Sequence, residues 1–339
     1  MFNLLEILNL KTYYYQGNAV IRAVDDITLA IRKGEVIGIA GESGCGKTTL
    51  ALSILRILPR NARIVGGKIL FRGTNLLSLT EEEMMRIRQR HISIIFQGPS
   101  PQSLNPLMFS GIQVAEAIEY HLGKDMSRAI RMAKELFEEV ELGASYLITL
   151  PHELSAGMLQ RVKIAMALST RPELIIADEP LVGLNTTIQA VLMDLLMRLK
   201  RKYGVSLMYL SHNLARMAEI ADRVAIMYAG KILEIGPTKD IFERPIHPYT
   251  KGLIGALPRI KKIREQRRRG LIWVPGNPPS PSNPPKGCRF HPRCPIAKEI
   301  CKTQEPPRVR IGESIAYCHF AEEIKDTSPY DFWAPFLFK

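Results

Sequence analysis

The feature that most constrains the fold is a glycine-rich loop at residues 41–49, with the sequence GESGCGKTT. Gly41, Gly46, Lys47 and Thr48 have the spacing G-x-x-x-x-G-K-[ST] of a phosphate-binding loop. The apolar segment EVIGIA before the loop predicts a buried strand, and TTLALSILRIL after it has the periodicity of a helix. Because a strand and a helix flank the loop, the sequence predicts an α/β protein that binds a nucleotide.

A phosphate-binding loop turns its backbone N–H groups inward around the β-phosphate of a nucleotide. We expect Lys47 to reach the β- and γ-phosphate oxygens, and the hydroxyl of Thr48 to bind Mg²⁺. The residues of this loop expected to contact ATP are Gly41, Glu42, Ser43, Gly44, Cys45, Gly46, Lys47, Thr48 and Thr49.

A second motif is the segment LIIADEP at residues 174–180. Its four leading apolar residues predict a strand buried on both faces, which ends in two carboxylates. We expect Asp178 to hold Mg²⁺ and Glu179 to polarise the attacking water. An Asp–Glu pair alone is more often a helix cap or a solvated turn, but its position downstream of a phosphate loop favours the catalytic interpretation.

Two more predicted strands end in a polar side chain. Gln97 follows ISIIF, and His212 follows VSLMYLS. Ligands of open α/β sheets bind at the carboxyl ends of the strands, so we expect Gln97 to contact Mg²⁺ and water, and His212 to hydrogen-bond the γ-phosphate. Either residue alone would usually be structural, and it is their order along the chain that favours a site.

Together with these motifs, the segment LSAGMLQRVKIAMALS at residues 154–169 resembles the signature segment of ABC transporter ATP-binding cassettes. Ser155 is expected to cap a helix whose first amides point at an anion. The resemblance implies that Ser155 and Gly157 contact ATP held by a partner cassette, so that two cassettes close face to face on two nucleotides. It also implies an aromatic residue that stacks on adenine, for which TYYYQG at residues 12–17 offers Tyr14, with Tyr13 and Tyr15 as alternatives.

The chain departs from the family pattern at two positions on the face presented to the partner. Ala156 replaces the first glycine of the usual LSGG, and an added methyl group can hinder the approach of backbone to phosphate. Asn185 follows Leu184 where the family usually has Leu-Asp. We therefore expect an asymmetric pair, in which the site on this chain's own phosphate loop hydrolyses ATP well and the site that relies on Ser155 is weaker.

The composition of the 339 residues is that of a soluble protein, with 46% hydrophobic and 23% charged residues. No apolar run approaches the roughly 18 to 20 residues that cross a bilayer, and the N-terminus lacks the pattern of a signal peptide. We expect a peripheral protein at the cytoplasmic face of the cell membrane. Part of the net charge of +13 is concentrated in RIKKIREQRRR at residues 259–269. This run predicts a solvated linker or helix face, and a contact with the membrane or a translocation subunit is the second interpretation.

Three parts are predicted along the chain. Residues 1–236 form a nucleotide-binding domain with a doubly wound core, and about 98–164 within it, loops plus amphipathic helices, form an inserted helical subdomain. Residues 237–339 are a small proline- and cysteine-rich extension. Within it, HPYTKGLIGALP at 247–258 and the segment 274–301 resemble the C-terminal extension of ATPases of oligopeptide and dipeptide importers.

Four cysteines in the extension have the spacing C-x5-C-x6-C-x16-C. Disulfides are unlikely in a reducing cytosol, so a metal centre is the better interpretation. A 4Fe–4S cluster is favoured over Zn²⁺, because the close C-x2-C pairs of zinc ribbons are missing, and the absence of any metal stays open. The expected ligands are Cys288, Cys294, Cys301 and Cys318, with His291 and His319 as alternatives.

The resemblance implies a subunit that binds and hydrolyses ATP to drive an ABC importer of di- and oligopeptides. Its implied partners are a second homologous ATPase in a heterodimer, two transmembrane permease subunits and an extracytoplasmic substrate-binding protein. The substrate would not contact this chain, so import of oligosaccharides or nickel stays open. The rival hypothesis is a soluble ABC ATPase that acts on nucleic acid or ribosomes. It is disfavoured because only about 130 residues separate Lys47 from Asp178, and no nucleic acid partner is expected.

Overall fold

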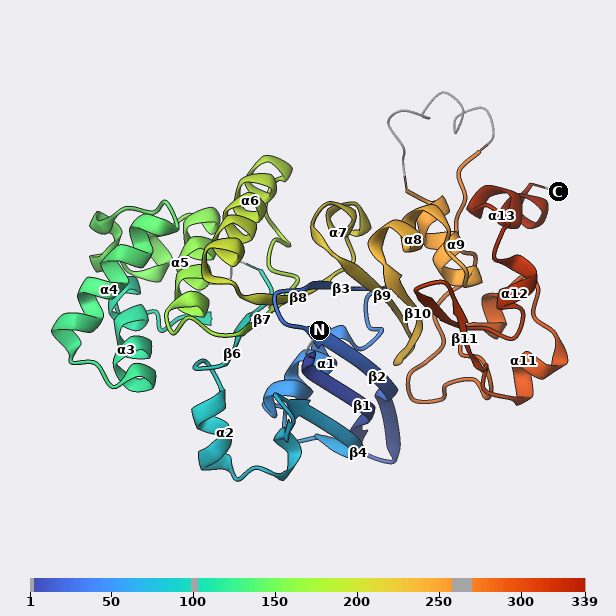
Figure 1. Ribbon diagram of the computed structural model, residues 1–339, viewed down its shortest axis with the longest axis horizontal. Helices are drawn as coiled ribbons and strands as arrows, with labels where there is room; N and C mark the ends of the chain where they lie inside the picture. The colour runs from blue at the N-terminus through green and yellow to red at the C-terminus, as the bar shows by residue number, and fades with distance from the viewer. Residues whose placement is uncertain (1–2, 99–102, 258–269, 339) are drawn as a thin grey trace. The chain divides into compact units, whose positions relative to one another are not determined.

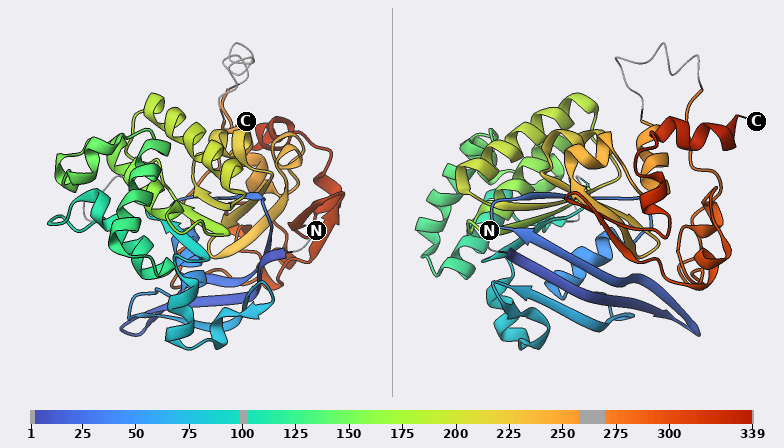
Figure 2. Two further views of the ribbon diagram at one scale, coloured as in Figure 1. Left: turned by 60° about the vertical axis from the view of Figure 1, so that its left-hand side comes forward. Right: turned by 45° about the vertical axis from the view of Figure 1, so that its right-hand side comes forward.

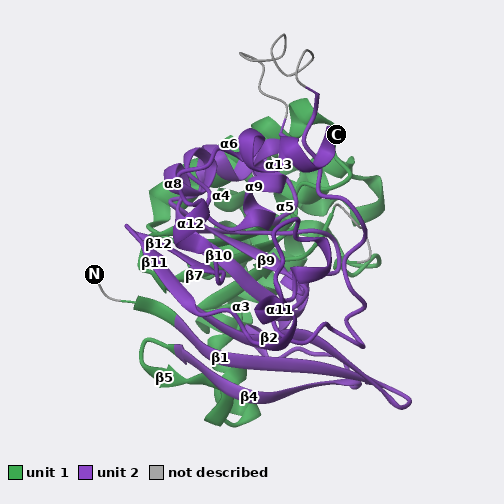
Figure 3. Ribbon diagram, turned by 90° about the vertical axis from the view of Figure 1, so that its right-hand side faces the viewer, with its two compact units in different colours: residues 1–5, 31–36, 71–210 green, residues 6–30, 37–70, 211–339 purple. Residues whose placement is uncertain are grey.

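The computed structural model describes residues 3–98, 103–257 and 270–338 (Figure 1). The basic run at residues 259–269, for which a linker or a membrane contact was predicted, lies outside the described residues. The chain divides into two compact units, coloured separately in Figure 3. Unit 1 comprises residues 1–5, 31–36 and 71–210, and unit 2 comprises residues 6–30, 37–70 and 211–339.

Unit 1 contains a small parallel sheet and most of the longer helices. Its strands and helices are β5 (Thr74–Asn75), α2 (Glu81–Ile87), β6 (Ile92–Ile95), α3 (Ser110–Leu122), α4 (Met126–Glu139), α5 (Ala156–Leu168), β7 (Leu174–Asp178), α6 (Thr186–Tyr203) and nearly all of β8 (Ser206–Ser211). Short 3-10 turns at Leu76–Ser78, Ala144–Ile148 and Pro151–Glu153 connect them.

The sheet of unit 1 has parallel pairing in the order β8, β7, β6. Ala177 of β7 is level with Ile95 of β6 on one side and with Tyr209 of β8 on the other. All five residues of β7 are buried, as predicted for a strand covered on both faces. This register brings the carboxyl ends of the three strands to one edge of the sheet.

Helices α3, α4 and α5 lie side by side within unit 1, as the views in Figures 1 and 2 agree. The amphipathic helix predicted in this region is confirmed as α4, whose buried residues Ala129, Ala133, Leu136 and Phe137 recur with helical spacing. Asp125 caps its start by accepting a hydrogen bond from the backbone N–H of Arg128 at 2.9 Å. The buried stripe explains why α4 packs on its neighbours.

Unit 2 contains most of β1, β2 and β4, the helix after the glycine-rich loop, and the C-terminal extension. Its elements are β1 (Asn3–Gln16), β2 (Ala19–Arg32), β3 (Val36–Ala40), α1 (Lys47–Leu55), β4 (Ala62–Phe71), α7 (Leu214–Ile220), β9 (Arg223–Tyr228), β10 (Lys231–Pro237), α8 (Thr238–Glu243), α9 (Pro248–Gly255), a 3-10 turn (His291–Arg293), α11 (Glu299–Thr303), β11 (Arg308–Ile311), β12 (Ser314–Tyr317), α12 (Ala321–Ile324) and α13 (Pro329–Leu337).

The extension continues a sheet of unit 2. Strand β3 pairs in parallel with β9, and β9, β10, β12 and β11 follow in antiparallel order. Strand β12 joins β10 through the pairs Glu234–Ala316 and Ile235–Ile315. The last strands of the chain therefore share a sheet with the strand that leads into the glycine-rich loop. No helix among the described residues is long and apolar enough to span a bilayer.

Candidate functional site

The glycine-rich loop connects β3 to α1 in unit 2, and two of its glycines leave no space for a side chain. Gly46 has a φ of +109°, and a Cβ there would lie 2.0 Å from the carbonyl oxygen of Ala23. At Gly41 a Cβ would lie 2.1 Å from the carbonyl oxygen of Met227. Both positions therefore exclude every other residue type. Helix α1 begins at Lys47, directly after Gly46, so the N–H groups of its first turn face the preceding part of the loop as an anion site requires.

Lys47 is held inside the loop that precedes it. Its ammonium donates hydrogen bonds to the carbonyl oxygens of Gly41 at 2.9 Å and Glu42 at 3.4 Å, and the residue is only 7% exposed. Thr48, the next residue, is exposed. Burial raises the pKa of the neighbouring Cys45 thiol, which keeps it protonated beside the ammonium. The loop thus presents one buried cation and the exposed hydroxyl residues Ser43 and Thr48.

Strand β1 packs one face against α1. Thr12 and Tyr14, two residues apart on β1, hydrogen-bond Ser53 at 2.8 Å and Thr49 at 3.2 Å, which are four residues apart on α1. Tyr13 points to the other side of the strand, where its hydroxyl donates to Asp25 at 2.7 Å. Of the three tyrosines offered for adenine, Tyr14 is therefore the one that contacts the loop helix.

In unit 1, Gln97, Asp178 and Glu179 lie together at the carboxyl edge of the sheet. Asp178 ends β7, and Gln97 follows two residues after β6. The N–H of Gly98 donates to the carbonyl oxygen of Glu179 at 3.4 Å, which joins the two strand ends. Their amide and carboxylate oxygens are ligands that Mg²⁺ prefers, so these residues of unit 1 fit this ion.

Glu179 has an unusual backbone conformation. Its φ is +44°, in the left-handed region that non-glycine residues rarely adopt. Its N–H donates to the carbonyl oxygen of Leu210 at 2.9 Å, so the neighbouring strand fixes this geometry. Eight other non-glycine residues of the described chain also have a positive φ, so the catalytic role of this carboxylate stays a prediction.

His212 belongs to unit 2, in the loop between β8 and α7, and is exposed. The next residue, Asn213, caps α7 by accepting from the N–H of Arg216 at 3.2 Å. His212 therefore projects from a loop that a helix cap holds in place. Its predicted contact with the γ-phosphate stays a prediction.

The predicted cap at Ser155 is confirmed. Its hydroxyl accepts a hydrogen bond from the N–H of Met158 at 3.4 Å at the start of α5, and Ala156 is the first helical residue. Asn185 likewise caps α6, accepting from the N–H of Ile188 at 2.9 Å. The departure from aspartate at this position thus keeps the cap, because the asparagine side chain supplies the same acceptor without the charge.

The sequence motifs did not single out Lys163. This residue lies on α5, is 6% exposed, and donates to the carbonyl oxygens of Phe96 at 3.2 Å and of Gly98, on either side of Gln97. Burial lowers its pKa to about 8. The available signal was a lysine inside the otherwise apolar stretch VKIAMAL, where a charge without a specific partner would be costly.

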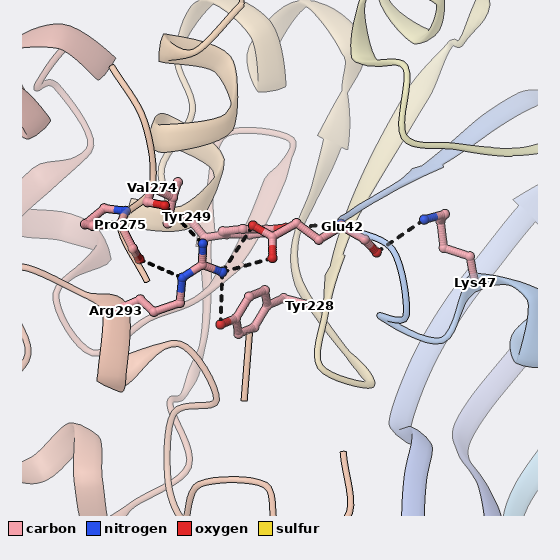
Figure 4. Close-up of polar contacts among 7 residues, drawn as sticks. All are labelled: Glu42, Lys47, Tyr228, Tyr249, Val274, Pro275 and Arg293. Atoms are coloured by element: carbon pink, nitrogen blue, oxygen red, sulfur yellow. Dashed lines mark hydrogen bonds and ion pairs between the residues drawn. The ribbon is translucent and has the colours of Figure 1, made fainter. Parts of the chain in front are cut away.

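Two residues of the extension that the motifs did not single out also reach the phosphate loop. Arg293 and Tyr249 both contact Glu42, all within unit 2 (Figure 4). Neither contact could be anticipated, because 251 residues separate Arg293 from Glu42 and no local pattern connects them.

The four cysteines of the extension lie within electrostatic range of one another: burial first, and then the charges of Cys288, Cys318 and Cys301, raise the pKa of the Cys294 thiol. Cys288, Cys301 and Cys318 are buried, and the N–H of Cys288 donates to the carbonyl oxygen of Cys301 at 2.8 Å. Within residues 3–98, 103–257 and 270–338, however, no three histidine, cysteine, aspartate or glutamate side chains are placed to hold a metal ion. The described residues therefore do not support the predicted cluster or its zinc alternative.

Comparison with known proteins covers both the core and the extension. The family model for the ABC transporter matches residues 24–182, and that for the C-terminal region of the oligopeptide/dipeptide transporter matches residues 233–301. A probable peptide ABC transporter ATP-binding protein of Sinorhizobium fredii is 42% identical, over 95% of this chain and 96% of its own length.

Two further relatives also match this chain along most of their length. The oligopeptide transport ATP-binding protein OppD of Salmonella typhimurium is 41% identical over 89% of both chains, and the dipeptide transport ATP-binding protein DppD of Escherichia coli is 38% identical over 94% of this chain and 96% of its own. Among solved structures, the dimeric ATP-binding cassette MJ0796 bound to ADP and Pi superimposes with a TM-score of 0.62 and 25% identity, over 69% of this chain and 98% of the other. The predicted α/β cassette fold is therefore confirmed.

Proposed function

The chain belongs to the ABC transporter family of peptide-import ATP-binding proteins, and we propose that it hydrolyses ATP to energise an importer of di- and oligopeptides. The observation that carries the proposal is identity near 40% to these relatives along nine-tenths of both chains, cassette and extension together. Matching over the extension distinguishes this group, because the cassette alone is common to the whole family.

The residues of this chain have separate roles in the proposal. Lys47 and Thr48 hold the phosphates and Mg²⁺, with Asp178 and Gln97 as further oxygen ligands. Mg²⁺ supplies positive charge that lowers the barrier to phosphoryl transfer. Glu179 accepts the proton of the attacking water, His212 hydrogen-bonds the γ-phosphate, and Tyr14 stacks on adenine.

Ser155 and Gly157 would act on the nucleotide of the partner. The first N–H groups of α5 carry partial positive charge, which suits a γ-phosphate presented by a second cassette. ATP then favours the closed pair and hydrolysis favours the open one, which is how a ligand shifts a population between two states. Ala156 and Asn185 support an asymmetric heterodimer, in which the site on this chain's own loop is the more active.

The chain would work at the cytoplasmic face of the membrane with two permease subunits and an extracytoplasmic binding protein. The proposed inserted subdomain, about residues 98–164, contains α3, α4 and the first part of α5, and together with the loop after Gln97 it would receive the permeases. The substrate stays with the permeases and the binding protein. Uptake assays in proteoliposomes with a di- or tripeptide, an oligosaccharide and Ni²⁺ as separate arms decide among the three cargo classes.

The main test is Glu179→Gln in the assembled complex. Glutamine cannot accept the proton of water, so we expect ATP turnover to fall about 100-fold or more while ATP binding persists. The control is Glu82→Gln, which removes the same charge from an exposed position on α2. Unchanged turnover in Glu179→Gln would refute the catalytic assignment, and a larger loss from the equivalent change in the partner ATPase would reverse the proposed asymmetry.

We further propose a 4Fe–4S cluster at Cys288, Cys294, Cys301 and Cys318, with Zn²⁺ as the alternative, from the spacing of these cysteines and from the resemblance of the extension to that of importer ATPases. If the cluster forms, protein purified without oxygen should contain about four irons per chain and absorb visible light. One zinc per chain with no iron would replace the cluster by zinc, and neither metal would refute both.

A further inference from the structure

Arg293 of the extension makes a fully engaged contact with Glu42 of the phosphate loop (Figure 4). One guanidinium nitrogen donates to both carboxylate oxygens of Glu42, at 2.9 and 3.1 Å, and lies 3.3 Å from the hydroxyl of Tyr228. The other two nitrogens donate to the carbonyl oxygens of Val274 at 3.1 Å and Pro275 at 2.9 Å. Every nitrogen of this side chain therefore has a partner.

Burial separates this ion pair from an ordinary surface pair. The side chain of Arg293 is 6% exposed and that of Glu42 is 27% exposed. Exposed pairs contribute little, because water screens them and both side chains lose freedom. A buried arginine with every nitrogen engaged is already fixed, so loss of either partner leaves the other charge uncompensated.

The extension also contacts the backbone of Glu42. Its backbone N–H donates to the hydroxyl of Tyr249 on α9, at 3.3 Å. The ring of Tyr249 is buried and packs against Tyr228 and Phe290, with ring centroids 4.6 and 5.3 Å away. The extension thus fixes both the carboxylate and the main chain of one loop residue.

The opposite side of Glu42 faces the lysine of the loop. The carbonyl oxygens of Glu42 and Gly41 accept from the ammonium of Lys47, so this peptide segment sets the position from which the lysine reaches a phosphate. The carboxylate of Glu42 would also repel a polyphosphate unless a cation neutralised it. Arg293 supplies that charge from outside the loop.

The same segment of the extension also contacts the strands before the loop. Arg289 forms a buried ion pair with Asp25 of β2, which in turn accepts from Tyr13, the neighbour of Tyr14 on β1. Residues 289–293 therefore contact both the phosphate loop and the strand pair that bears the proposed adenine contact.

We propose that Arg293 is a positioning residue for ATP, which holds and neutralises Glu42 so that the phosphate loop is preorganised by the C-terminal extension. The proposal deepens the proposed function and rests on it, since it presumes that the loop binds ATP. Preorganisation lowers the cost of ordering the loop on binding, so its loss should act on affinity more than on the chemical step.

The test uses the assembled complex with Arg293→Gln, Glu42→Gln and the double variant. We expect Arg293→Gln to raise the KM and the Kd for Mg-ATP about tenfold and to lower kcat less than threefold. Because Arg293 acts through Glu42, the double variant should match Glu42→Gln alone within about twofold. Arg293→Lys keeps the charge without the fork of nitrogens and should recover part of the affinity.

The matched control is Arg310→Gln, an exposed arginine on β11 of the same extension. A KM for Arg293→Gln equal to that of the control, or single effects that multiply in the double variant, overturns the proposal. If Arg293→Gln does not fold, Glu42→Gln and Arg293→Lys decide it, because each must then raise the KM above that of the control. A wild-type complex that hydrolyses ATP without importing peptide contradicts the proposed function and leaves this inference intact.

Discussion

Glu234 is a carboxylate buried completely in the middle of β10. It accepts hydrogen bonds from the backbone N–H groups of Ile246 and His247, both at 2.8 Å. Burial disfavours its charged form and raises its pKa from 4.5 to about 7. The folded protein therefore binds a proton at this group between pH 4.5 and 7 that the unfolded chain releases, so its contribution to stability is lost as pH rises through this range.

Replacing Glu234 by glutamine should remove this dependence, because glutamine resembles the protonated carboxyl at every pH. Between pH 5 and pH 8 we expect the unfolding free energy of wild type to fall by roughly 2 to 3 kcal/mol relative to Glu234→Gln. Urea unfolding at the two pH values measures this difference. The control is Glu313→Gln, in the exposed turn between β11 and β12. An equal change for both variants would show that Glu234 is ionised throughout.

The buried ring of His247 gives the stability of the protein a second pH dependence. Burial lowers its pKa to about 3, so the folded protein keeps this ring neutral where the unfolded chain would protonate it. Its contribution to stability is lost as pH falls below 6.5, in the opposite direction to that of Glu234. The two effects offset each other in the wild-type protein, and only the difference from Glu234→Gln isolates the carboxylate.

At the scale of elements, helix α5 is tied to the loop after β6 through Lys163. The ammonium donates to the carbonyl oxygens of Phe96 and Gly98, so the helix that begins at Ser155 fixes the backbone around Gln97. Movement of α5 would therefore move Gln97, which connects the proposed partner contact to the proposed Mg²⁺ ligand.

Substituting Lys163 by methionine should uncouple these two elements. We expect kcat for ATP in the assembled complex to fall about tenfold with the KM within twofold, because the loop loses its anchor while the phosphate loop is untouched. Thermal unfolding should change little, since methionine fills a similar volume and removes a buried charge. The control is Arg131→Met, at an exposed position on the adjacent α4. An equal kcat for both variants would contradict the coupling of α5 to the backbone around Gln97.

At the scale of the whole molecule, the parts that the sequence predicted well are those encoded within one motif. The spacing of Gly46 and Lys47 fixes a loop whose geometry depends on neighbouring residues, and the apolar run before Asp178 specifies a buried strand by itself. The cap at Ser155 is local for the same reason.

The parts that could not be predicted depend on contacts between distant segments. Arg293 lies in a stretch of cysteines and prolines whose spacing indicated a metal, yet its side chain reaches a glutamate at the other end of the chain. Lys163 occupies an apolar helix position, and only the folded arrangement reveals the two carbonyl groups that it contacts. The sequence therefore marks Lys163 as a charge in an apolar stretch but does not identify its partners, and nothing in local spacing connects Arg293 to Glu42.

The pairing of β12 on β10 has a consequence for any shortened version of this protein. A chain cut after Pro237 would keep every motif of the cassette. It would lose β12, so the backbone N–H and C=O groups of β10 that pair with β12 would be unpaired. Such an edge is a template for the strand of another molecule, so the fragment would tend to self-associate into aggregates. In the full chain, β12 occupies this edge of β10.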